Sequence, residues 1–413
     1  ASDVYKRQDL AANDAFEERK MKKVLAAIIF CNFLISSVFA ADIKVGFVTT
    51  LTTPAAVIGE DMKNAVNLAL EHLNGKAGAH NIEVVFGDDG FAPDTGKQVT
   101  DRLLKQDKVD IISGYIWSHV LLASRKSVLD AGKILISSNA GPSQIASKLC
   151  HENFFSASWQ NDQTPMAMGE VFNKDGIKSL YIMAPNYAAG KDMVAGIERT
   201  FKGQVVGKDL TKWGADAQLD FSAELAKAKV SGADGLFVFY PGAASGAFTK
   251  QYHQAGLKDL LPLYSVFTID GISLPKLQAA NFSGIVGSKV TQQWDPSLDN
   301  PANKRFVSDF KERFGKYPSF YAAQSYDTIN MIASAVIAVD GDMNNLAGLR
   351  SALKSADYNS VRGKYSYGNN NFPIQNFYLR EVVKDSDGNW TTEVIDTVLT
   401  NHQDPYAAEC KLK

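Results

Sequence analysis

The sequence lacks an excess of charge of either sign, and it is poor in histidine. Its 43 Lys and Arg residues nearly balance its 45 Asp and Glu residues, which gives a formal net charge of -2. A nucleic-acid partner is not expected, because no basic surplus exists to neutralise phosphates. The six histidines show no metal-ligand spacing, and no Walker loop, G-x-S-x-G or G-x-G-x-x-G motif follows an expected strand. We therefore expect no metal, no cofactor and no catalysis.

Long apolar runs are also scarce, and the one that stands out lies near the start of the chain. Residues 24–39 follow two lysines and end with small side chains at the recognition positions of a secretory signal cut after Ala40. The run is shorter than the ~20 residues of a membrane-spanning helix, so the mature protein is expected to be free in solution. Cys31 lies inside the run behind bulky Phe30, which argues against a lipid anchor. Residues 1–20 show no apolar period, and we interpret them as an upstream, non-native or read-through segment.

Cysteine is rare as well, with three residues in the whole chain. Cleavage after Ala40 removes Cys31 and leaves Cys150 and Cys410. An even pair in an exported protein predicts a disulfide, and the alternative is two free buried thiols.

What the sequence does contain is a regular alternation of short β-rich runs and amphipathic helical patterns. A first series of expected strands covers residues 43–48, 82–86, 109–112 and 133–136, and a second covers 179–183, 204–207, 235–240 and 285–290. Repeated units of this kind build α/β folds with parallel sheets flanked by helices. Because one core stops growing near ~250 to 300 residues, 413 residues predict two lobes. We expect residues 41–158 with 291–368 in lobe 1 and 159–290 with 369–413 in lobe 2, with crossovers near Ser158, Thr291 and Asn369.

Binding residues are expected in the loops that follow the strands, because ligands of open parallel sheets lie at the carboxyl ends of the strands. These loops are rich in aromatic and small hydroxyl residues. The aromatic candidates for stacking on a planar ligand are Tyr115, Trp117, Tyr187, Tyr240 and Phe267. The candidates for holding a carboxylate at helix N-termini are Ser118, Ser138 and the amide of Ala140. Thr53, Asn139, Trp159, Thr268, Asp270 and Gln292 complete the predicted set. For each loop the alternative is that hydroxyls only cap helices and rings only pack.

The neighbouring pair Ser118 and His119 is the one arrangement that suggests hydrolysis. Adjacent positions on a helix point about 100° apart, so the two side chains do not face each other. The pattern therefore does not predict a catalytic triad.

Several ordered motifs together resemble the type I periplasmic binding proteins of ABC importers, and within them the branched-chain amino acid (Leu/Ile/Val) binding family. The motifs span the chain from Asp42 to its end and comprise Asp42-Ile43-Lys44-Val45-Gly46, Gly59-x-x-Met62-x-x-Ala65, Ile136-Ser137-Ser138-Asn139-Ala140, Trp159-Gln160-Asn161-Asp162-Gln163, Asn186-Tyr187-Ala188-Ala189-Gly190 and Tyr321-Ala322-Ala323-Gln324-Ser325-Tyr326-Asp327. The resemblance implies two Rossmann-like lobes joined by three strands, a ligand between them, a periplasmic location and delivery to an inner-membrane permease. A monomer is expected.

The resemblance also bears on the ligand. Trp117, the Trp159 segment and Tyr187 look like the branch of the family that takes up aromatic acids such as benzoate or hydroxycinnamate derivatives. Amino-acid binders of the family use an acidic residue for the ammonium group, and Asp270 is the candidate here. If Asp270 faces the cleft, an amino acid or amide is favoured; if it caps the helix around residues 272–277, an aromatic acid is favoured. A ligand-sensing module or an enzyme is the alternative of a different class.

Overall fold

The computed structural model describes residues 42–214 and 217–412. The predicted leader, Cys31 and the upstream segment lie outside the described residues.

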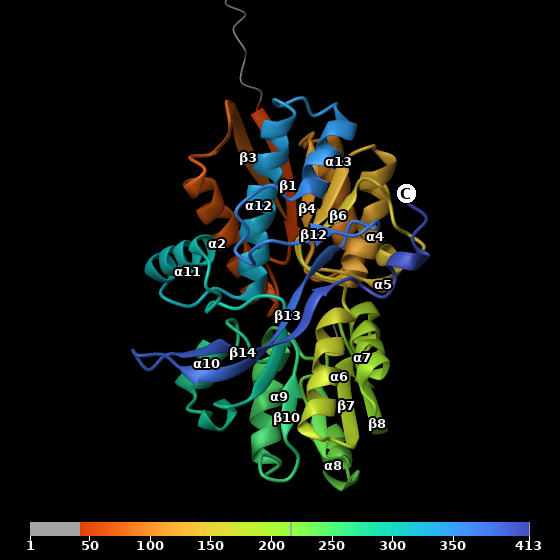
Figure 1. Cartoon of the computed structure of the whole chain (residues 1–413), viewed down its shortest axis with the longest axis vertical. Coiled ribbons are helices and arrows are strands. Elements are labelled where there is room, and N and C mark those ends of the chain that lie inside the picture. The colour runs from red at the N-terminus through yellow and green to blue at the C-terminus, as the bar shows by residue number, and fades with distance from the viewer. Residues whose placement is uncertain (1–41, 215–216, 413) are drawn as a thin grey trace, which may run out of the picture. The chain divides into compact units, whose positions relative to one another are not determined.

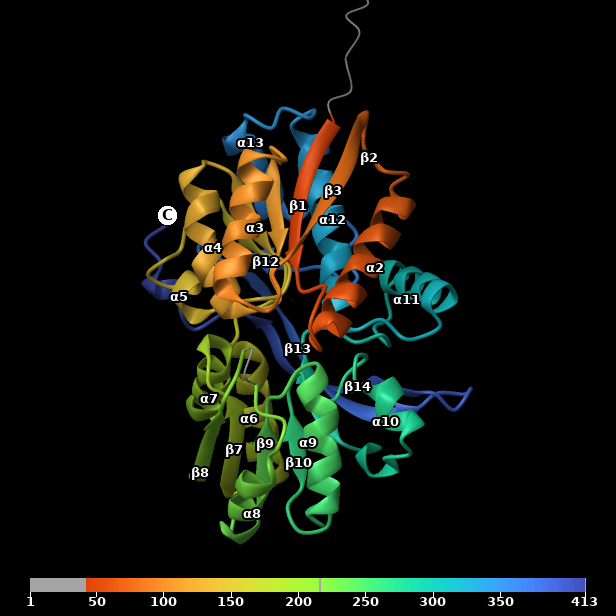
Figure 2. The same ribbon diagram turned by 180° about the vertical axis from the view of Figure 1, so that it is seen from behind.

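The first half of the chain builds a six-stranded sheet in the order β2-β3-β1-β4-β5-β6. Every neighbouring pair is parallel except β2 with β3. The elements are β1 (Asp42–Thr49), α2 (Ala56–His72), β2 (Lys76–Ala77), β3 (His80–Asp88), α3 (Pro93–Lys105), β4 (Ile111–Gly114), α4 (Ser118–Asp130), β5 (Ile134–Ser137), α5 (Ser143–Ala146) and β6 (Phe154–Ser156). Figures 1 and 2 show helices on both faces of this sheet, with α3 and α4 on one face and α12 on the other.

The next segment builds a second sheet in the order β12-β13-β11-β10-β9-β7-β8, with β14 paired to β13. Its elements are α6 (Gln163–Asp175), β7 (Ser179–Pro185), α7 (Ala188–Thr200), β8 (Gln204–Thr211), α8 (Ser222–Val230), β9 (Gly235–Val238), α9 (Ala243–Gln254), β10 (Leu263–Ser265), α10 (Leu274–Ala279), η1 (Ser283–Ile285) and β11 (Lys289–Gln292). Strands β7 to β11 pair in parallel.

The remaining elements return to the first sheet and then back to the second. They are α11 (Pro301–Phe314), α12 (Phe320–Ala338), α13 (Leu346–Ser355), β12 (Ser366–Tyr367), β13 (Pro373–Lys384), β14 (Trp390–His402) and η2 (Ala407–Glu409). Helix α12 packs along α2, whereas β13 pairs with β11. The predicted lobe boundaries and crossovers stay a prediction.

Alternating side chains explain why each sheet is covered on both faces. In β7, Leu180 and Ile182 join the buried cluster under α6 and α7, whereas Tyr181 and Met183 join the cluster under α8 and α9. Successive strand residues point to opposite faces, so a strand buried on both sides is apolar throughout. This apolar pattern is why the strands could be predicted from the sequence.

The prediction of a mixed α/β fold with two parallel-dominated sheets and flanking helices is confirmed. Each sheet also has antiparallel strands at one edge, β2 in the first sheet and β12, β13 and β14 in the second. The turn at Asp385, whose Oδ1 accepts the N–H groups of Asp387 and Asn389, allows β14 to fold back on β13. Helix α13 was not predicted.

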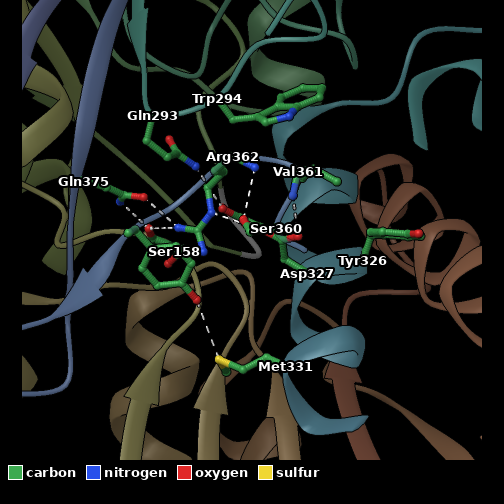
Figure 3. A network of polar contacts seen from close by, with 12 residues as sticks. Ser158, Gln293, Trp294, Tyr326, Asp327, Met331, Ser360, Val361, Arg362 and Gln375 are labelled. Atoms are coloured by element: carbon green, nitrogen blue, oxygen red, sulfur yellow. Dashed lines mark hydrogen bonds and ion pairs between the residues drawn. The ribbon is translucent and has the colours of Figure 1, made fainter. Parts of the chain in front are cut away.

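A buried ion pair ties together the segments that lead from one sheet to the other. Arg362 is bonded to Asp327 of α12 at 3.2 Å and donates through Nη1 to the carbonyl of Ser158 and to Oε1 of Gln375. Gln375 also donates to the Ser158 carbonyl, at 2.6 Å. Figure 3 shows the guanidinium of Arg362 between these groups. The network thus joins α12, the segment after β6 and strand β13.

Candidate functional site

A small cavity lies where the carboxyl ends of strands from both sheets meet. Its residues follow β4, β5, β6, β7, β9 and β10, with one more from α12. They are Ile116, Trp117, Ser118, Asn139, Ala140, Trp159, Asn161, Tyr187, Ala189, Met193, Phe239, Pro241, Phe267 and Tyr321. The space between them, with the solvent at its mouth included, is about 280 Å³.

One wall of the cavity is the N-terminus of α4. The first N–H groups of any helix have no acceptor within the helix. Trp117, which precedes α4, does not accept a hydrogen bond from them through its side chain. The indole of Trp117 is fixed by its own N–H, which donates to Thr50 Oγ1 at 2.8 Å. Ser118 accepts a hydrogen bond from Asn161 at 3.1 Å, which leaves its hydroxyl hydrogen to donate. The wall therefore offers hydrogen-bond donors and the positive end of a helix dipole.

Other parts of the lining are also aromatic. Trp159 stacks on Phe267, with ring centroids 4.8 Å apart and 20° between the planes. Tyr187 stacks on Trp213 at 5.6 Å and on Phe239 at 6.3 Å. Nε1 of Trp159 is buried and finds no hydrogen-bond partner within the described part of the chain. A ligand in the cavity would thus meet flat apolar rings.

None of the side chains that line the cavity, all within the described residues, is charged. A carboxylate lies one step behind the lining, where Asp192 accepts hydrogen bonds from Asn161 at 2.9 Å and from the hydroxyl of Ser143 at 2.7 Å. Burial raises the pKa of Asp192 to about 6, and its three hydrogen bonds oppose that rise. Asp192 orients Asn161 and, through it, Ser118.

Asp270 does not line this cavity, and it holds the turn into α10 instead. Its Oδ1 accepts the N–H groups of Ile272 at 2.9 Å and Ser273 at 3.2 Å. Burial raises the pKa of Asp270 to about 7. Asp270 thus stabilises the turn that precedes α10, whose N-cap residue is Ser273.

The structure brings seven predicted residues together in the cavity wall, namely Trp117, Ser118, Asn139, Ala140, Trp159, Tyr187 and Phe267. Two of them are already occupied. The amide of Ala140 donates to the carbonyl of Tyr115. It is therefore not available to bind a carboxylate, contrary to our expectation from the sequence. Asn139 donates to the carbonyl of Ile116 and accepts from Gln324. Both residues shape the wall rather than offer free donors.

Other predicted residues lie away from the cavity wall. Tyr115 is fully buried and its hydroxyl pairs with Thr100 at 2.7 Å. Tyr240 packs against Phe221 and Phe248. Their rings are turned into the core, which is the packing alternative.

The polar candidates outside the cavity also have other surroundings. Ser138 pairs with Ser113 and Thr328, and Thr268 accepts the N–H of Tyr240. Thr53 is exposed, and Gln292 is fully buried.

Several lining residues were missed from the sequence. Phe239 immediately precedes the predicted Tyr240, and the two rings belong to different buried clusters. Asn161 and Tyr321 lie in motifs that carried the family resemblance, and their positions there were the available signal.

Cys150 and Cys410, the predicted pair, form a disulfide with their Cα atoms 5.8 Å apart. In residues 42–214 and 217–412 no group of three His, Cys, Asp or Glu side chains is placed to hold a metal ion. Within the same ranges no helix has the length and apolar character to cross a membrane.

Comparison with known proteins gives one consistent result. A family model described as periplasmic binding protein matches residues 42–389. Leu/Ile/Val-binding protein homolog 6 of Brucella abortus (strain 2308) is 28% identical over 391 residues, covering 91% of this chain and 97% of that protein. The solute-binding protein of an ABC transporter from R. palustris in complex with benzoate is similar, with TM-score 0.82 and 29% identity over 90% of this chain and 100% of that one.

A second solute-binding protein from R. palustris, in complex with 4-hydroxybenzoate, has TM-score 0.79 and 26% identity over 87% of this chain and 98% of that one. With the matched family model, these likenesses show that the chain belongs to the periplasmic binding protein family, as a solute-binding protein of ABC transporters.

Proposed function

We propose that this protein captures a small aromatic carboxylate, of the benzoate or hydroxycinnamate type, and delivers it to the permease of an ABC importer in the inner membrane. The observation that carries the proposal is the cavity lining, which combines several aromatic rings with Ser118 at the uncapped N-terminus of α4 and contains no charged side chain. Stacking holds the ring, and the helix terminus with the Ser118 hydroxyl holds the carboxylate.

The absence of charge among the lining residues separates this proposal from an amino-acid ligand. An ammonium group buried in the cavity would need an acidic partner, since an unpaired buried charge is costly. Asp270 holds the turn before α10 and does not line the cavity wall in the described structure. The similar R. palustris proteins in complex with benzoate and 4-hydroxybenzoate agree with an aromatic acid. The Brucella homologue's name keeps a branched-chain amino acid as the second candidate.

Uptake requires that ligand binding change the conformation of the protein. The cavity draws Trp117 and Ser118 from the first sheet and Tyr187 and Phe267 from the second, so one ligand would contact both. A ligand that binds the closed arrangement better than the open one drives closure by that difference in affinity. Export by a leader cut after Ala40 is part of the proposal and places the protein in the periplasm.

The test is calorimetric titration of the mature protein with benzoate, 4-hydroxybenzoate and 4-hydroxycinnamate. We expect at least one of them to bind, and saturation at 100 times its Kd to add about 2.7 kcal/mol to the free energy of unfolding. Ser118→Ala should raise the Kd by about 10-fold or more, since a hydrogen bond to a charged group contributes roughly 1.5 to 3 kcal/mol.

Ser222→Ala is the matched control, because Ser222 is the first residue of α8 and lies outside the cavity. It should leave the Kd unchanged. The proposal fails if none of the three acids binds, or if both serine variants bind them equally to the unaltered protein.

A further inference from the structure

A buried carboxylate connects an element of the second sheet to an element of the first, close to the cavity. Asp192 lies on α7, which follows β7 of the second sheet, and it is 6% exposed. Its Oδ2 accepts the N–H of Ser143 at 3.0 Å, and its Oδ1 accepts the Ser143 hydroxyl at 2.7 Å. Ser143 begins α5, which follows β5 of the first sheet. These two hydrogen bonds are lost if the two sheets move apart.

A third hydrogen bond leads from the same carboxylate to the cavity wall. Nδ2 of Asn161 donates one hydrogen to Oδ2 of Asp192 at 2.9 Å and the other to Oγ of Ser118 at 3.1 Å. Oδ1 of Asn161 accepts the N–H of Gly141 at 3.2 Å, so both ends of the amide are engaged. A ligand carboxylate on the Ser118 hydroxyl would therefore be separated from the Asp192 carboxylate by one serine and one asparagine.

The helices packed against α7 bring further titratable groups to Asp192. Helix α6 is preceded by Asp162, which is fully buried and accepts hydrogen bonds from Arg199 at 2.9 Å and Tyr406 at 3.0 Å. Helix α4 contributes His119. Helix α5, which supplies the two donors of Ser143, contains no charged side chain.

These surroundings make ionised Asp192 unfavourable in the described arrangement. Burial, and then the negative charge of Asp162, raise the pKa of Asp192 to about 6, although the hydrogen bonds from Ser143 and Asn161 oppose the rise. Tyr187, at the start of α7, is neutral because burial raises its pKa as well. An aspartate in water has a pKa near ~3.9, so Asp192 holds its proton more tightly when the two sheets are together than when it is hydrated.

A bound anion increases this difference. A ligand carboxylate at Ser118 adds a second buried negative charge, and like charges raise each other's pKa. Protonated Asp192 also keeps its contacts, because a hydroxyl both donates and accepts. The Ser143 hydroxyl can turn to accept the new proton from Oδ1, while Oδ2 still accepts its two N–H donors.

We propose that capture of the anionic ligand is coupled to the uptake of a proton from solvent by Asp192, so that binding becomes tighter as the medium becomes more acidic. The proton adds to Oδ1 of Asp192, which then donates it to the Ser143 hydroxyl. The inference rests on the function proposed above, because it requires a ligand with a negative charge at Ser118.

The direction of the proton exchange distinguishes Asp192 from His119. Burial lowers the pKa of His119 to about 4, so covering His119 releases a proton, whereas covering Asp192 takes one up. Protonation of the ligand itself is a third contribution. A comparison of the unaltered protein with Asp192→Asn isolates Asp192, because His119 and the ligand are the same in both.

The experiment is calorimetric titration of both proteins at pH 5.5, in two buffers of different ionisation enthalpy, with the tightest binder among benzoate, 4-hydroxybenzoate and 4-hydroxycinnamate. The unaltered protein should take up about 0.7 proton more than Asp192→Asn, as follows from a pKa that moves from ~3.9 to about 6. From pH 7 to pH 5 its Kd should fall about 10-fold relative to the Kd of the variant. Equal proton exchange in the two proteins overturns the inference alone, whereas failure of all three acids to bind overturns the proposed function and the inference with it.

Asp89→Asn is the matched control. Burial raises the pKa of Asp89 to about 6 as well, but Asp89 bonds to Thr50 and to the N–H of Phe91, which all follow strands of the first sheet. This variant should keep the proton uptake. Loss of the uptake in Asp89→Asn but not in Asp192→Asn overturns the inference.

Ser143→Ala gives a second test that stands even if Asp192→Asn does not fold. The Ser143 hydroxyl stabilises the charged form of Asp192, and hydrogen bonds to a charged group are the stronger ones. Its removal should therefore move the midpoint of the proton uptake to a higher pH. A midpoint that stays in place overturns the inference.

Discussion

At the scale of single residues, burial changes the chemistry of side chains that the sequence shows as ordinary polar groups. His119 packs edge-on against the rings of Phe91 and Tyr187, next to the cavity wall. Burial lowers the pKa of His119 to about 4, so its imidazole is neutral in the folded protein at neutral pH. It follows that His119 acts as packing under Tyr187 and holds one of the stacked rings in place.

The low pKa of His119 makes the free energy of unfolding depend on pH. The unfolded chain takes up this proton near pH 6.5, whereas the folded protein resists it down to about pH 4. The contribution is therefore fully present above pH 6.5 and is lost as the pH falls toward 4, up to about 3 kcal/mol at ~1.4 kcal/mol per pKa unit. His119→Gln should reduce the loss of unfolding free energy between pH 7 and pH 4.5, measured by urea titration. An unchanged slope would contradict this account.

At the scale of elements, the buried pair of Arg362 and Asp327 joins α12 to the segments that connect the sheets. The side chains are 2% and 0% exposed. Ser360 and Val361 also donate to Asp327, so the carboxylate is fully engaged. Removing the cation alone would leave a buried charge without its partner, which is far more costly than losing a pair on the surface.

We expect Arg362→Met to lower the free energy of unfolding by about 3 to 5 kcal/mol. Lys304→Met removes the cation of an exposed pair, whose partner Asp299 is 85% exposed, and should cost less than about 1 kcal/mol. Urea unfolding of the two variants measures the difference. Equal effects would show that the network adds nothing beyond a surface pair.

At the scale of the whole molecule, the disulfide links the segment after η2 to the loop between α5 and β6, next to the first sheet. Cys410 follows η2 and bonds to Cys150, 260 residues earlier. The same tail is held by Asn370, which donates to Asp404, and by Tyr406, which donates to Asp162 and lies under Arg199. The bond closes a long loop, and in the chain-entropy description its main effect is on the unfolded state.

Replacing both cysteines by serine should lower the free energy of unfolding by about 2 to 5 kcal/mol, with the effect seen as a fall in Tm. Benzoate affinity should remain, since neither cysteine lines the cavity. A free-thiol count of two in the unreduced, unfolded mature protein would contradict the bond itself.

The alternation of apolar runs and helical patterns was enough to predict the two α/β sheets, because a strand buried on both faces must be apolar along its length. It was also enough to direct attention to the loops at the strand ends, where Trp117, Ser118, Trp159 and Tyr187 do line the cavity. The sequence could not say which way each loop residue turns. Tyr115 adopts a left-handed backbone with φ of 64° and buries its ring.

The tertiary structure decided what lies beside what. It set Phe239 rather than Tyr240 in the cavity wall, and it used Asp270 for a turn instead of the cleft. It also placed Tyr321 and Asn161 in the same cavity wall as Trp117 and Phe267, which are distant from them in the sequence. The physical reason is that hydrophobic patterning is local and nondirectional, whereas a binding wall is made by backbone dihedrals and hydrogen bonds between segments that meet only after folding.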